Sequence, residues 1–433
     1  MKGRHGLIED QIRELRQGRE LDELAQRLQP DGSPPARRLA TSAKVNADRA
    51  LKFWQKMPAG DDIRDRLLDP VTLAEIESYQ GNIENCIGAV RVPVGVVGPL
   101  RINGLAAKGD YHVPLATTEA AMVASYHRGA MLLSAVGGCS AMVLYESVNR
   151  APALAFTNLA EAARFVVWIT EQFPALQDIA AGTTRHGRLI DMSPIVEGNH
   201  VYLDFDFRTA DASGQNMVTI ATEAICQHIR EHSPVRPQRL FVEGNVSGDK
   251  KASARAFGKV RGKKVTADVR LPAEVVQRYL HTDTARLCDY WQMSAVGGVL
   301  SGTMGVQGHF ANGLAALYLA TGQDVACVAE SAVGITRFDR NDDGSLYAAV
   351  TLPGIMLGTV GGGTGLPSQQ ACLSLLGLNG AGCSRALAEV CAGLLLGGEL
   401  SIIGAMAAGE FSRAHHKLAR TRVPAPPPAG EEG

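Results

Sequence analysis

The stretch Val201-Tyr-Leu-Asp-Phe-Asp-Phe207, followed by Asp211-Ala-Ser-Gly214, decides the fold of the middle of the chain. Apolar and polar side chains alternate from Val201 to Phe207, which is typical of a β-strand with one buried face. The Asp-Ala-Ser-Gly segment predicts a turn, and residues 215–230 predict a helix. Strand, turn and helix together form one half of an α/β unit.

The turn between this strand and helix has two interpretations. A helix N-terminus offers unpaired N–H groups and a positive dipole to a pyrophosphate, so the turn is a candidate dinucleotide site. Asp and Ser are also common helix caps, which would make the segment an ordinary turn. The usual G-x-G-x-x-G pattern is missing, so a standard Rossmann fold is not supported. The candidate cofactor ligands are Asp211, Ser213, Gly214, Gln215 and Asn216.

The segments on either side predict a mixed α and β chain of two or three domains. Valine-rich residues 92–102 and 265–271 predict extended strands. Helices are predicted within 7–28 and 43–56 and from Thr117 through Arg128, and the chain beyond 275 is mostly helical. The region up to residue 87 is a predicted helical domain, and the proline-rich tail from Val423 is predicted to be disordered.

Composition excludes several classes of function. The chain carries 43 Lys and Arg against 44 Asp and Glu, so no basic excess favours nucleic acid. Eight cysteines without a C-x-x-C pair predict reduced thiols in a cytosolic protein and argue against zinc. Asp339-Arg-Asn-Asp-Asp-Gly344 resembles a calcium loop, but its twelfth position is Val350 instead of Glu, so calcium is rejected and an exposed turn is expected.

One segment is long enough to span a bilayer. Residues 293–323 contain no Asp, Glu, Lys or Arg. Their many glycines lower helix stability unless tight packing compensates, which favours a buried helix pair in a soluble protein. The N-terminus lacks the apolar core of a signal peptide, so neither a signal nor a membrane anchor is expected.

Four ionisable residues, Glu119, Lys250, Asp324 and His415, each lie in a distinctive apolar or glycine-rich stretch. An acid, a cation, a second carboxylate and an imidazole could together move protons and stabilise an oxyanion, as reduction of a thioester requires. The apolar run after Glu119 predicts a half-buried carboxylate with a raised pKa.

Each candidate also has an ordinary explanation. The lysines at 250 and 251 could form a solvated face, Asp324 could cap a helix or form a salt bridge, and His415 could lie on the surface. Residues 358–364, with Gly361 and Gly362, could approach a ligand or form a tight turn. Residues 183–188 could be a solvated loop, or Arg185 could hold a ribose 2′-phosphate and select NADP.

Together these stretches resemble the 3-hydroxy-3-methylglutaryl-CoA reductase family over residues 8–420, in the soluble, class I-like form without a membrane domain. The motifs occur in the family's order: Glu84-Asn-Cys-Ile-Gly88, Val92-Pro-Val-Gly-Val-Val-Gly-Pro99, Ala116-Thr-Thr-Glu119, Asp249-Lys-Lys251, Thr321-Gly-Gln-Asp324, Gly358-Thr-Val-Gly-Gly-Gly-Thr364, Pro367-Ser-Gln-Gln-Ala-Cys372 and Gly398-Glu-Leu-Ser401.

The resemblance implies a domain organisation and a cofactor. It implies an N-terminal helical domain (1–87), a large helix-rich substrate domain (88–151 and 242–422) and a small inserted α/β domain (152–241) that binds NADPH. It also implies a cytoplasmic homodimer with active sites at the subunit interface, near residues 84–88.

Roles for individual residues follow from the same resemblance. Lys250 would stabilise the oxyanion, His415 would protonate the departing CoA thiolate, Glu119 would supply a proton to the aldehyde, and Asp324 would tune their pKa values. Asp211, Asn216 and Arg185 would contact the dinucleotide. The implied substrate-binding residues are Arg150, Glu243, Asp249, Lys251, Gln292 and Asn312.

Two of these positions depart from the family pattern. The family serine that binds the terminal carboxylate of the substrate is replaced by Glu243, whose charge would repel an acid unless one of the two is protonated. A family lysine that binds the same carboxylate falls at Gln292 by ungapped counting. The reduction machinery therefore looks whole, and the acid-recognition pocket looks altered.

The leading hypothesis is an NADPH-dependent, four-electron reduction of hydroxymethylglutaryl-CoA to mevalonate with release of CoA. One alternative is a related enzyme that acts on an acyl thioester without a terminal carboxylate. Another is a non-catalytic CoA- or NADP-binding protein, although all four catalytic positions are retained. A hydrolase with His415 as base lacks a nucleophile-elbow Ser or Cys.

Overall fold

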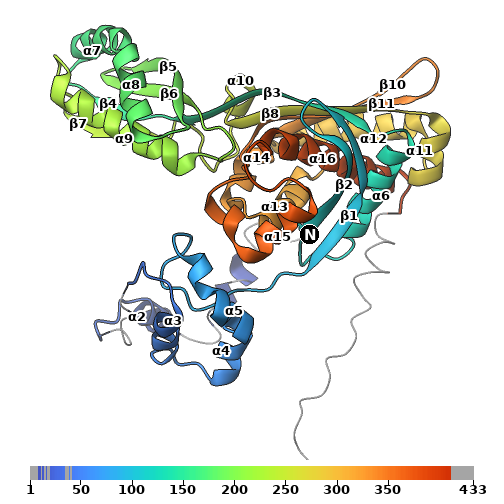
Figure 1. Cartoon of the computed structure of the whole chain (residues 1–433), viewed down its shortest axis with the longest axis horizontal. Coiled ribbons are helices and arrows are strands. Elements are labelled where there is room, and N and C mark those ends of the chain that lie inside the picture. Colours follow the sequence, from blue (N-terminus) through green and yellow to red (C-terminus); the bar gives the residue numbers. More distant parts are fainter. Residues whose placement is uncertain are drawn as a thin grey trace, which may run out of the picture. The chain divides into compact units, whose positions relative to one another are not determined.

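The computed structural model describes residues 8–10, 12–13, 16, 20–34, 39 and 41–410. The chain divides into two compact units, one ending at Gly88 and the other beginning at Ala89 (Figure 1). His415 and the predicted disordered tail, residues 423–433, lie outside the described residues.

The first unit is helical, as predicted. Its small core contains Ala50, Trp54 and Ile76, and the indole N–H of Trp54 donates to the carbonyl of Ile87 at 2.8 Å. The side chain of Asp69 caps the helix that begins at Pro70, a residue whose fixed φ suits the first helical position. The elements are α2 (Leu21–Arg27), α3 (Ala47–Trp54), α4 (Asp61–Leu67), α5 (Pro70–Glu75) and η1 (Ile76–Tyr79).

The second unit is built on an 11-stranded sheet, eight of whose strands follow the order β7-β4-β6-β3-β8-β11-β10-β9. Outside this order, β1 pairs with β2 and β3, and β5 pairs with β6. Its strands are β1 (Val94–Gly104), β2 (Lys108–Ala116), β3 (Cys139–Arg150), β4 (Ala153–Ala155), β5 (Arg188–Glu197), β6 (His200–Arg208), β7 (Arg239–Phe241), β8 (Gly262–Leu271), β9 (Gly305–Val306), β10 (Gly334–Arg340) and β11 (Leu346–Ile355).

Strand β3 runs through both halves of this sheet (Figure 1). Its first part pairs antiparallel with β8, from Ser140 to Ser147. Its last residues, Val148 to Arg150, pair with β6 of the segment predicted to hold the cofactor. The C-terminal end of β3 therefore places Asn149 and Arg150 where the two halves of the sheet meet.

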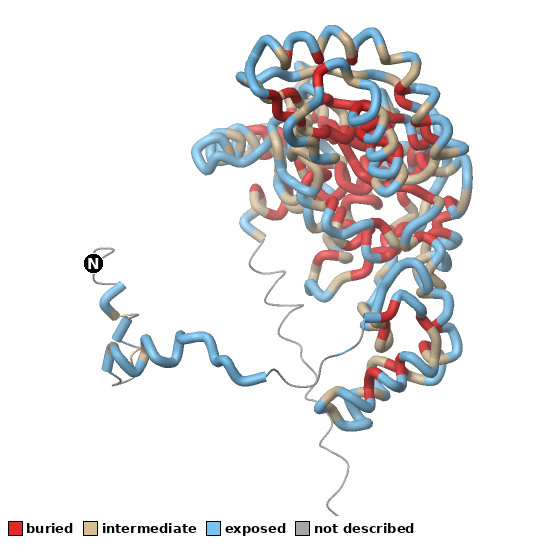
Figure 2. Tube along the Cα trace, turned by 90° about the vertical axis from the view of Figure 1, so that its left-hand side faces the viewer, coloured by how far each residue is buried: buried red, intermediate tan, exposed pale blue. Residues whose placement is uncertain are grey.

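Helices cover this sheet, and one of them forms the centre of the core. Almost every residue of α16 (Ser384–Ala407) is buried, and Figure 2 shows buried residues concentrated in this unit. Gly129 allows α6 (Met122–Ala135) to pack against it closely, since an added Cβ would lie 2.0 Å from the carbonyl oxygen of Gly397. The remaining helices are α7 (Leu159–Glu171), α8 (Phe173–Thr183), α9 (Gln215–His232), α10 (Arg255–Gly258), α11 (Ala273–Leu280), α12 (Thr284–Ser301), α13 (Phe310–Thr321), η2 (Val325–Cys327), α14 (Val328–Ser331), η3 (Gly362–Gly365) and α15 (Pro367–Leu375).

The mixed α/β prediction is confirmed, including the strand, turn and helix that decide the middle of the chain, now β6 and α9. The exposed turn at Asp339–Gly344 joins β10 to β11. The helix predicted to begin at Thr117 was wrong by several residues. Strand β2 continues to Ala116, and Ala121 has φ 68°, a left-handed conformation that cannot belong to a helix, so α6 begins at Met122.

The predicted buried helix pair in residues 293–323 was only half right. Helix α13 is buried, but the end of α12 exposes Met293, Val296, Val299 and Leu300. Within the described residues, α16 has the length and composition to cross a membrane, yet 89% of its apolar window is buried. Burial of that kind is found in the core helices of soluble proteins as well.

Candidate active site

Lys250 and Asp324 form an ion pair, with 2.8 Å between Nζ and Oδ2. Asp324 lies between α13 and η2, and its Oδ1 accepts a hydrogen bond from the N–H of Ala326 in η2. The hydrogen bond to Asp324 raises the pKa of Lys250, although partial burial opposes it. This geometry keeps a fixed positive charge at a surface accessible to a ligand, because both side chains are about two-fifths exposed.

Gln215 joins the half of the sheet that was predicted to bind the cofactor to this pair. Its Nε2 donates to Asp324 Oδ2 at 3.3 Å and to the Sγ of Cys327 at 2.9 Å. Gln215 is the first residue of α9, immediately after the predicted dinucleotide turn. The first turn of α9 therefore has two roles: it follows the predicted cofactor turn, and through Gln215 it helps to position the Lys250–Asp324 pair.

Arg261 is a buried guanidinium that holds two carboxylates beneath the site. It is 5% exposed, and it donates to Glu330 Oε2 and to Asp249 Oδ1 at 2.6 Å each. Its Nη1 also donates to the carbonyl of Asn149 at 2.7 Å. Burial raises the pKa of Glu330, and the charge of Arg261 acts in the opposite direction.

Sequence reasoning missed both Arg261 and Glu330. The available signal was weak: Glu330 is a charged residue within the otherwise apolar run Val328-Ala-Glu-Ser331, where a carboxylate requires a partner. Nothing in the sequence around Arg261 distinguishes it from the other basic residues of the same region, such as Arg255 and Lys259.

Arg150 lies at the end of β3 and is 7% exposed. Its Nη1 contacts Glu243 Oε2 at 3.2 Å and Asp249 Oδ2 at 3.1 Å. Its Nε is buried and has no hydrogen-bond partner among the described residues. Burial would raise the pKa of Asp249, but Arg261 and Arg150 outweigh it and lower that pKa.

The 242–251 loop therefore brings together several of the predicted substrate residues: Arg150, Glu243, Asp249 and Lys251. The Nζ of Lys251 donates to the carbonyl of Asp249 at 2.8 Å. Glu243 is not a free negative charge, as its replacement of serine suggested, because it pairs with Arg150. The negative charge at this position is thus paired, before any ligand binds, with a cation that Glu243 shares with Asp249.

Asp211 makes contacts that the sequence did not predict. Its carboxylate accepts hydrogen bonds from the N–H groups of Gly382 at 2.9 Å and Ser384 at 3.2 Å, where α16 begins. These bonds outweigh burial and lower the pKa of Asp211. Asp211 therefore fastens the predicted cofactor turn to the core helix in this structure.

The glycine-rich stretch 358–364 divides into two parts. Gly358 packs against the turn, since an added Cβ would lie 2.6 Å from the N–H nitrogen of Ser213. Gly361 and Gly362 have φ values of 74° and 56°, and an added Cβ on either would meet nothing within 4 Å. Their backbone faces open space, so this is the part that a dinucleotide could approach, and the residues present fit such a group.

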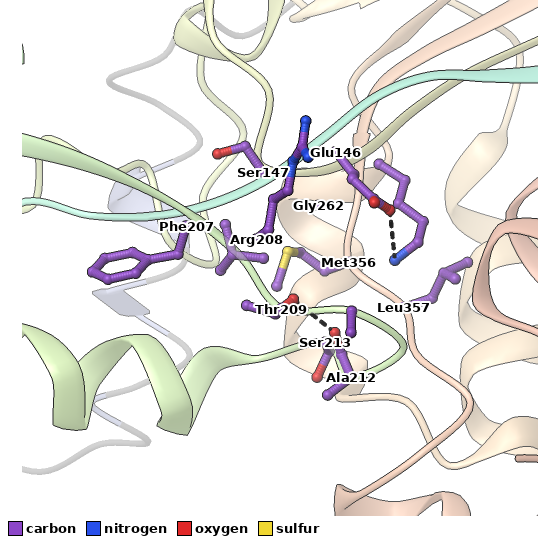
Figure 3. A pocket seen from close by; sticks show the side chains of 13 residues that line it. Glu146, Ser147, Phe207, Arg208, Thr209, Ala212, Ser213, Gly262, Met356 and Leu357 are labelled. Carbon is purple, nitrogen blue, oxygen red and sulfur yellow. Dashed lines mark hydrogen bonds and ion pairs between the residues drawn. The ribbon is translucent and has the colours of Figure 1, made fainter. Parts of the chain in front are cut away.

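A cavity lies behind the Asp211–Gly214 turn, with Thr209 and Ser213 on its wall (Figure 3). Lys263 also lines this cavity; it is 4% exposed, and its Nζ lies 4.0 Å from Glu146 Oε2. Burial lowers the pKa of Lys263. Glu146 is held mainly by Arg385, with 2.5 Å between Nη2 and Oε1.

The structure does not bring the other predicted residues into this cluster. Glu119 lies in the loop before α6 and is exposed, so the predicted half-burial was wrong: only the helix that follows it is packed into the core. Arg185, Asn216 and Gln292 are exposed, and Asn312 is half-buried on α13. No contact in the described part of the chain joins any of these five residues to Lys250 or Asp324.

Comparison with known proteins agrees with this arrangement. Residues 55–420 match the family model described as hydroxymethylglutaryl-coenzyme A reductase. The chain belongs to this family. It is 42% identical over 385 residues to the 3-hydroxy-3-methylglutaryl-coenzyme A reductase of Methanocaldococcus jannaschii, covering 87% of this chain and 94% of the relative. It is 44% identical over 352 residues to that of Aeropyrum pernix, covering 79% and 83%.

Solved reductase structures share the fold. The class II reductase of Streptococcus pneumoniae bound to NADPH superposes with a TM-score of 0.62 at 20% identity, covering 83% of this chain and 86% of the other. The family prediction and the prediction of an NADPH-dependent oxidoreductase are therefore confirmed. The class I-like subclass is not supported, because neither the family model nor the similar relatives distinguish a subclass.

Proposed function

We propose that this reductase-family chain reduces hydroxymethylglutaryl-CoA to mevalonate at the Lys250–Asp324 pair and releases CoA. The observation that carries the proposal is the 2.8 Å contact between Lys250 and Asp324 at the edge of the predicted cofactor turn. NADPH supplies the hydride for each of two successive reductions. The protein must then stabilise the oxyanion that forms at the carbonyl, deliver protons and hold the acyl group.

Lys250 is the residue that fits the first task. A fixed cation in a preorganised site stabilises developing negative charge without reorganisation in the transition state. Asp324 raises the pKa of Lys250 and so keeps the ammonium protonated. Because Asp324 also accepts from Gln215 and Ala326, it holds the ammonium in a defined place.

Proton delivery is assigned by the family motif. Glu119 supplies a proton during reduction of the aldehyde, and His415, outside the described residues, protonates the CoA thiolate. Glu119 lies in an exposed loop, where its carboxylate is accessible to a bound ligand and is not packed into the core. Its apo position does not argue against this role, since catalytic contacts often tighten only in the complex.

Ligand binding is divided between the two halves of the sheet. The N-terminus of α9 with Ser213, Gly214 and Asn216, together with Gly361 and Gly362, would hold the dinucleotide. Arg185 would contact its 2′-phosphate, and Asp211 would act by positioning the turn. Arg150, at the end of β3 beside Glu243, would bind the terminal carboxylate of the substrate.

The assembly in this proposal is a cytoplasmic homodimer. The C-terminal half of α12 exposes four apolar side chains: Met293 (77%), Val296 (61%), Val299 (74%) and Leu300 (83%). A second copy of the chain would cover this face, because exposed apolar clusters mark interaction sites. Light scattering should give twice the chain mass, and a Val296→Asp, Val299→Asp variant should give the monomer; a native monomer would refute the dimer.

A stoichiometric assay tests the function. Purified protein with limiting hydroxymethylglutaryl-CoA should oxidise two equivalents of NADPH per substrate and release one CoA. Lys250→Met should abolish turnover, whereas Lys108→Met, on exposed β2, should not. Turnover of only neutral acyl-CoA thioesters would identify the alternative substrate class, and absence of all turnover would leave a binding protein.

A further inference from the structure

We propose that Glu243 couples binding of an acidic acyl-CoA to uptake of a proton, and so acts as a specificity-determining residue. This inference rests on the proposed function, in which Arg150 receives the terminal carboxylate of the substrate. It concerns a carboxylate that stands where the family pattern has serine.

Glu243 is held in place on both of its oxygens. Oε2 contacts Arg150 Nη1 at 3.2 Å, and Oε1 accepts the N–H of Asn245 at 2.6 Å. The N–H of Ala151 also points to Oε2 at 3.4 Å. The carboxylate therefore belongs to the wall of the site, and its side chain remains 28% exposed to an incoming ligand.

Arg150 already serves two carboxylates before a substrate arrives. Glu243 and Asp249 share its Nη1, at 3.2 Å and 3.1 Å. The unpartnered donor is Nε, which lies on a side chain more than nine-tenths buried. A substrate carboxylate bound beside this guanidinium would be the third carboxylate next to it, after Glu243 and Asp249.

Of the two resident acids, Glu243 is the one that can be neutralised. Asp249 is held by a second cation, because Arg261 donates to its Oδ1 at 2.6 Å. Among the described residues, the ion pair of Glu243 is with Arg150 alone, a cation that it shares with Asp249 of the same loop. Glu330 pairs with Arg261, and within the described residues the hydrogen bond of the Lys251 ammonium is to the carbonyl of Asp249.

Like charges brought together within a few ångströms favour protonation of one of them. Near neutral pH, well above its ordinary pKa of about 4.3, the substrate carboxylate is ionised before it binds. The proton that neutralises one of the carboxylates in the complex must therefore come from solvent. Binding that takes up one proton weakens by about tenfold per pH unit while the free site remains ionised. A serine at this position would have no such dependence.

Isothermal titration calorimetry measures the proton directly. Hydroxymethylglutaryl-CoA is titrated into the full chain without NADPH, so that no reaction occurs, at one pH in phosphate and in Tris. Because these buffers differ in ionisation enthalpy, the difference in heat gives the number of protons taken up. Butyryl-CoA, which lacks the terminal carboxylate, is the matched ligand.

The wild-type chain should take up close to one proton with hydroxymethylglutaryl-CoA and none with butyryl-CoA. Glu243→Gln should take up none and should bind hydroxymethylglutaryl-CoA at least tenfold more tightly at pH 8. Glu243→Ser provides the same readout if the amide disturbs the loop, and Glu171→Gln, on an exposed helix end, is the matched control.

Zero uptake in the wild-type chain, or equal uptake in Glu243→Gln and wild type, would overturn the coupling. Failure of the proposed function looks different. If Arg150 does not receive the carboxylate, both thioesters should bind equally, and Arg150→Met should weaken neither of them.

Discussion

Lys250 Nζ and Asp324 Oδ2 lie 2.8 Å apart, although one residue is in a loop beside the sheet and the other follows a core helix. Lys250 has φ 58°, a left-handed conformation that is uncommon for residues other than glycine. The pair thus depends on two elements that only the folded chain places side by side.

Removing the carboxylate should move the alkaline limit of activity. Asp324 raises the pKa of Lys250, so the ammonium persists as pH rises until that raised pKa is passed. In Asp324→Asn the ammonium should be lost at a lower pH, and kcat should fall by about 10² to 10³ because an oxyanion stabiliser is misplaced. Profiles of kcat against pH test this, and an alkaline limb unchanged from wild type would contradict it.

Loss of the buried guanidinium should destabilise the fold. Arg261→Met leaves Glu330 and Asp249 without the partner that each contacts at 2.6 Å. Breaking a buried ion pair on one side costs about 3–5 kcal/mol, which urea unfolding can measure. Arg337→Met, which breaks an exposed pair with Asp339, should cost no more than about 1 kcal/mol. Equal losses in the two variants would show that burial does not decide the cost.

Acid stability should depend on Asp249. Its folded-state pKa is lowered, so its ionised form stabilises the fold above its unfolded pKa of about 3.9, and this stabilisation is lost as pH falls through the folded pKa. Asp249→Asn should therefore be less stable than wild type at pH 6, and the difference should shrink as pH falls through the folded-state pKa of Asp249. Asp342→Asn, in the exposed turn, is the control; a constant difference at all pH values would exclude the linkage.

The carboxylate of Asp211 should matter for packing more than for direct cofactor contact. It accepts from Gly382 and Ser384, so Asp211→Ala should cost about 1–2 kcal/mol, as loss of a helix cap does. NADPH binding should weaken as well, because the turn is no longer fastened to α16. Calorimetric melting and fluorescence titration separate the two effects, and weak binding with unchanged melting would indicate direct contact instead.

The local elements could be predicted because each depends on its own side chains. The alternation of apolar and polar residues predicted β6, and the turn Asp211–Gly214 predicted where α9 begins. The helix start near Glu119 could not be predicted, since the left-handed Ala121 is imposed by the end of β2 and the docking of α6. The exposure of Val296 on α12 was missed because a run of apolar residues does not indicate whether its helix will be buried in the core or exposed at the surface.

By itself the sequence determined the mixed fold and the identities of the residues at the candidate site, Lys250 and Asp324 among them, because motifs are carried by local chemistry. Only the tertiary structure decided their partners: Glu243 with Arg150, Arg261 with Glu330, and Asp211 with the start of α16. Burial is the reason. A charge in a low-dielectric interior must be paired, and which partner it finds depends on the packing of segments distant in the chain.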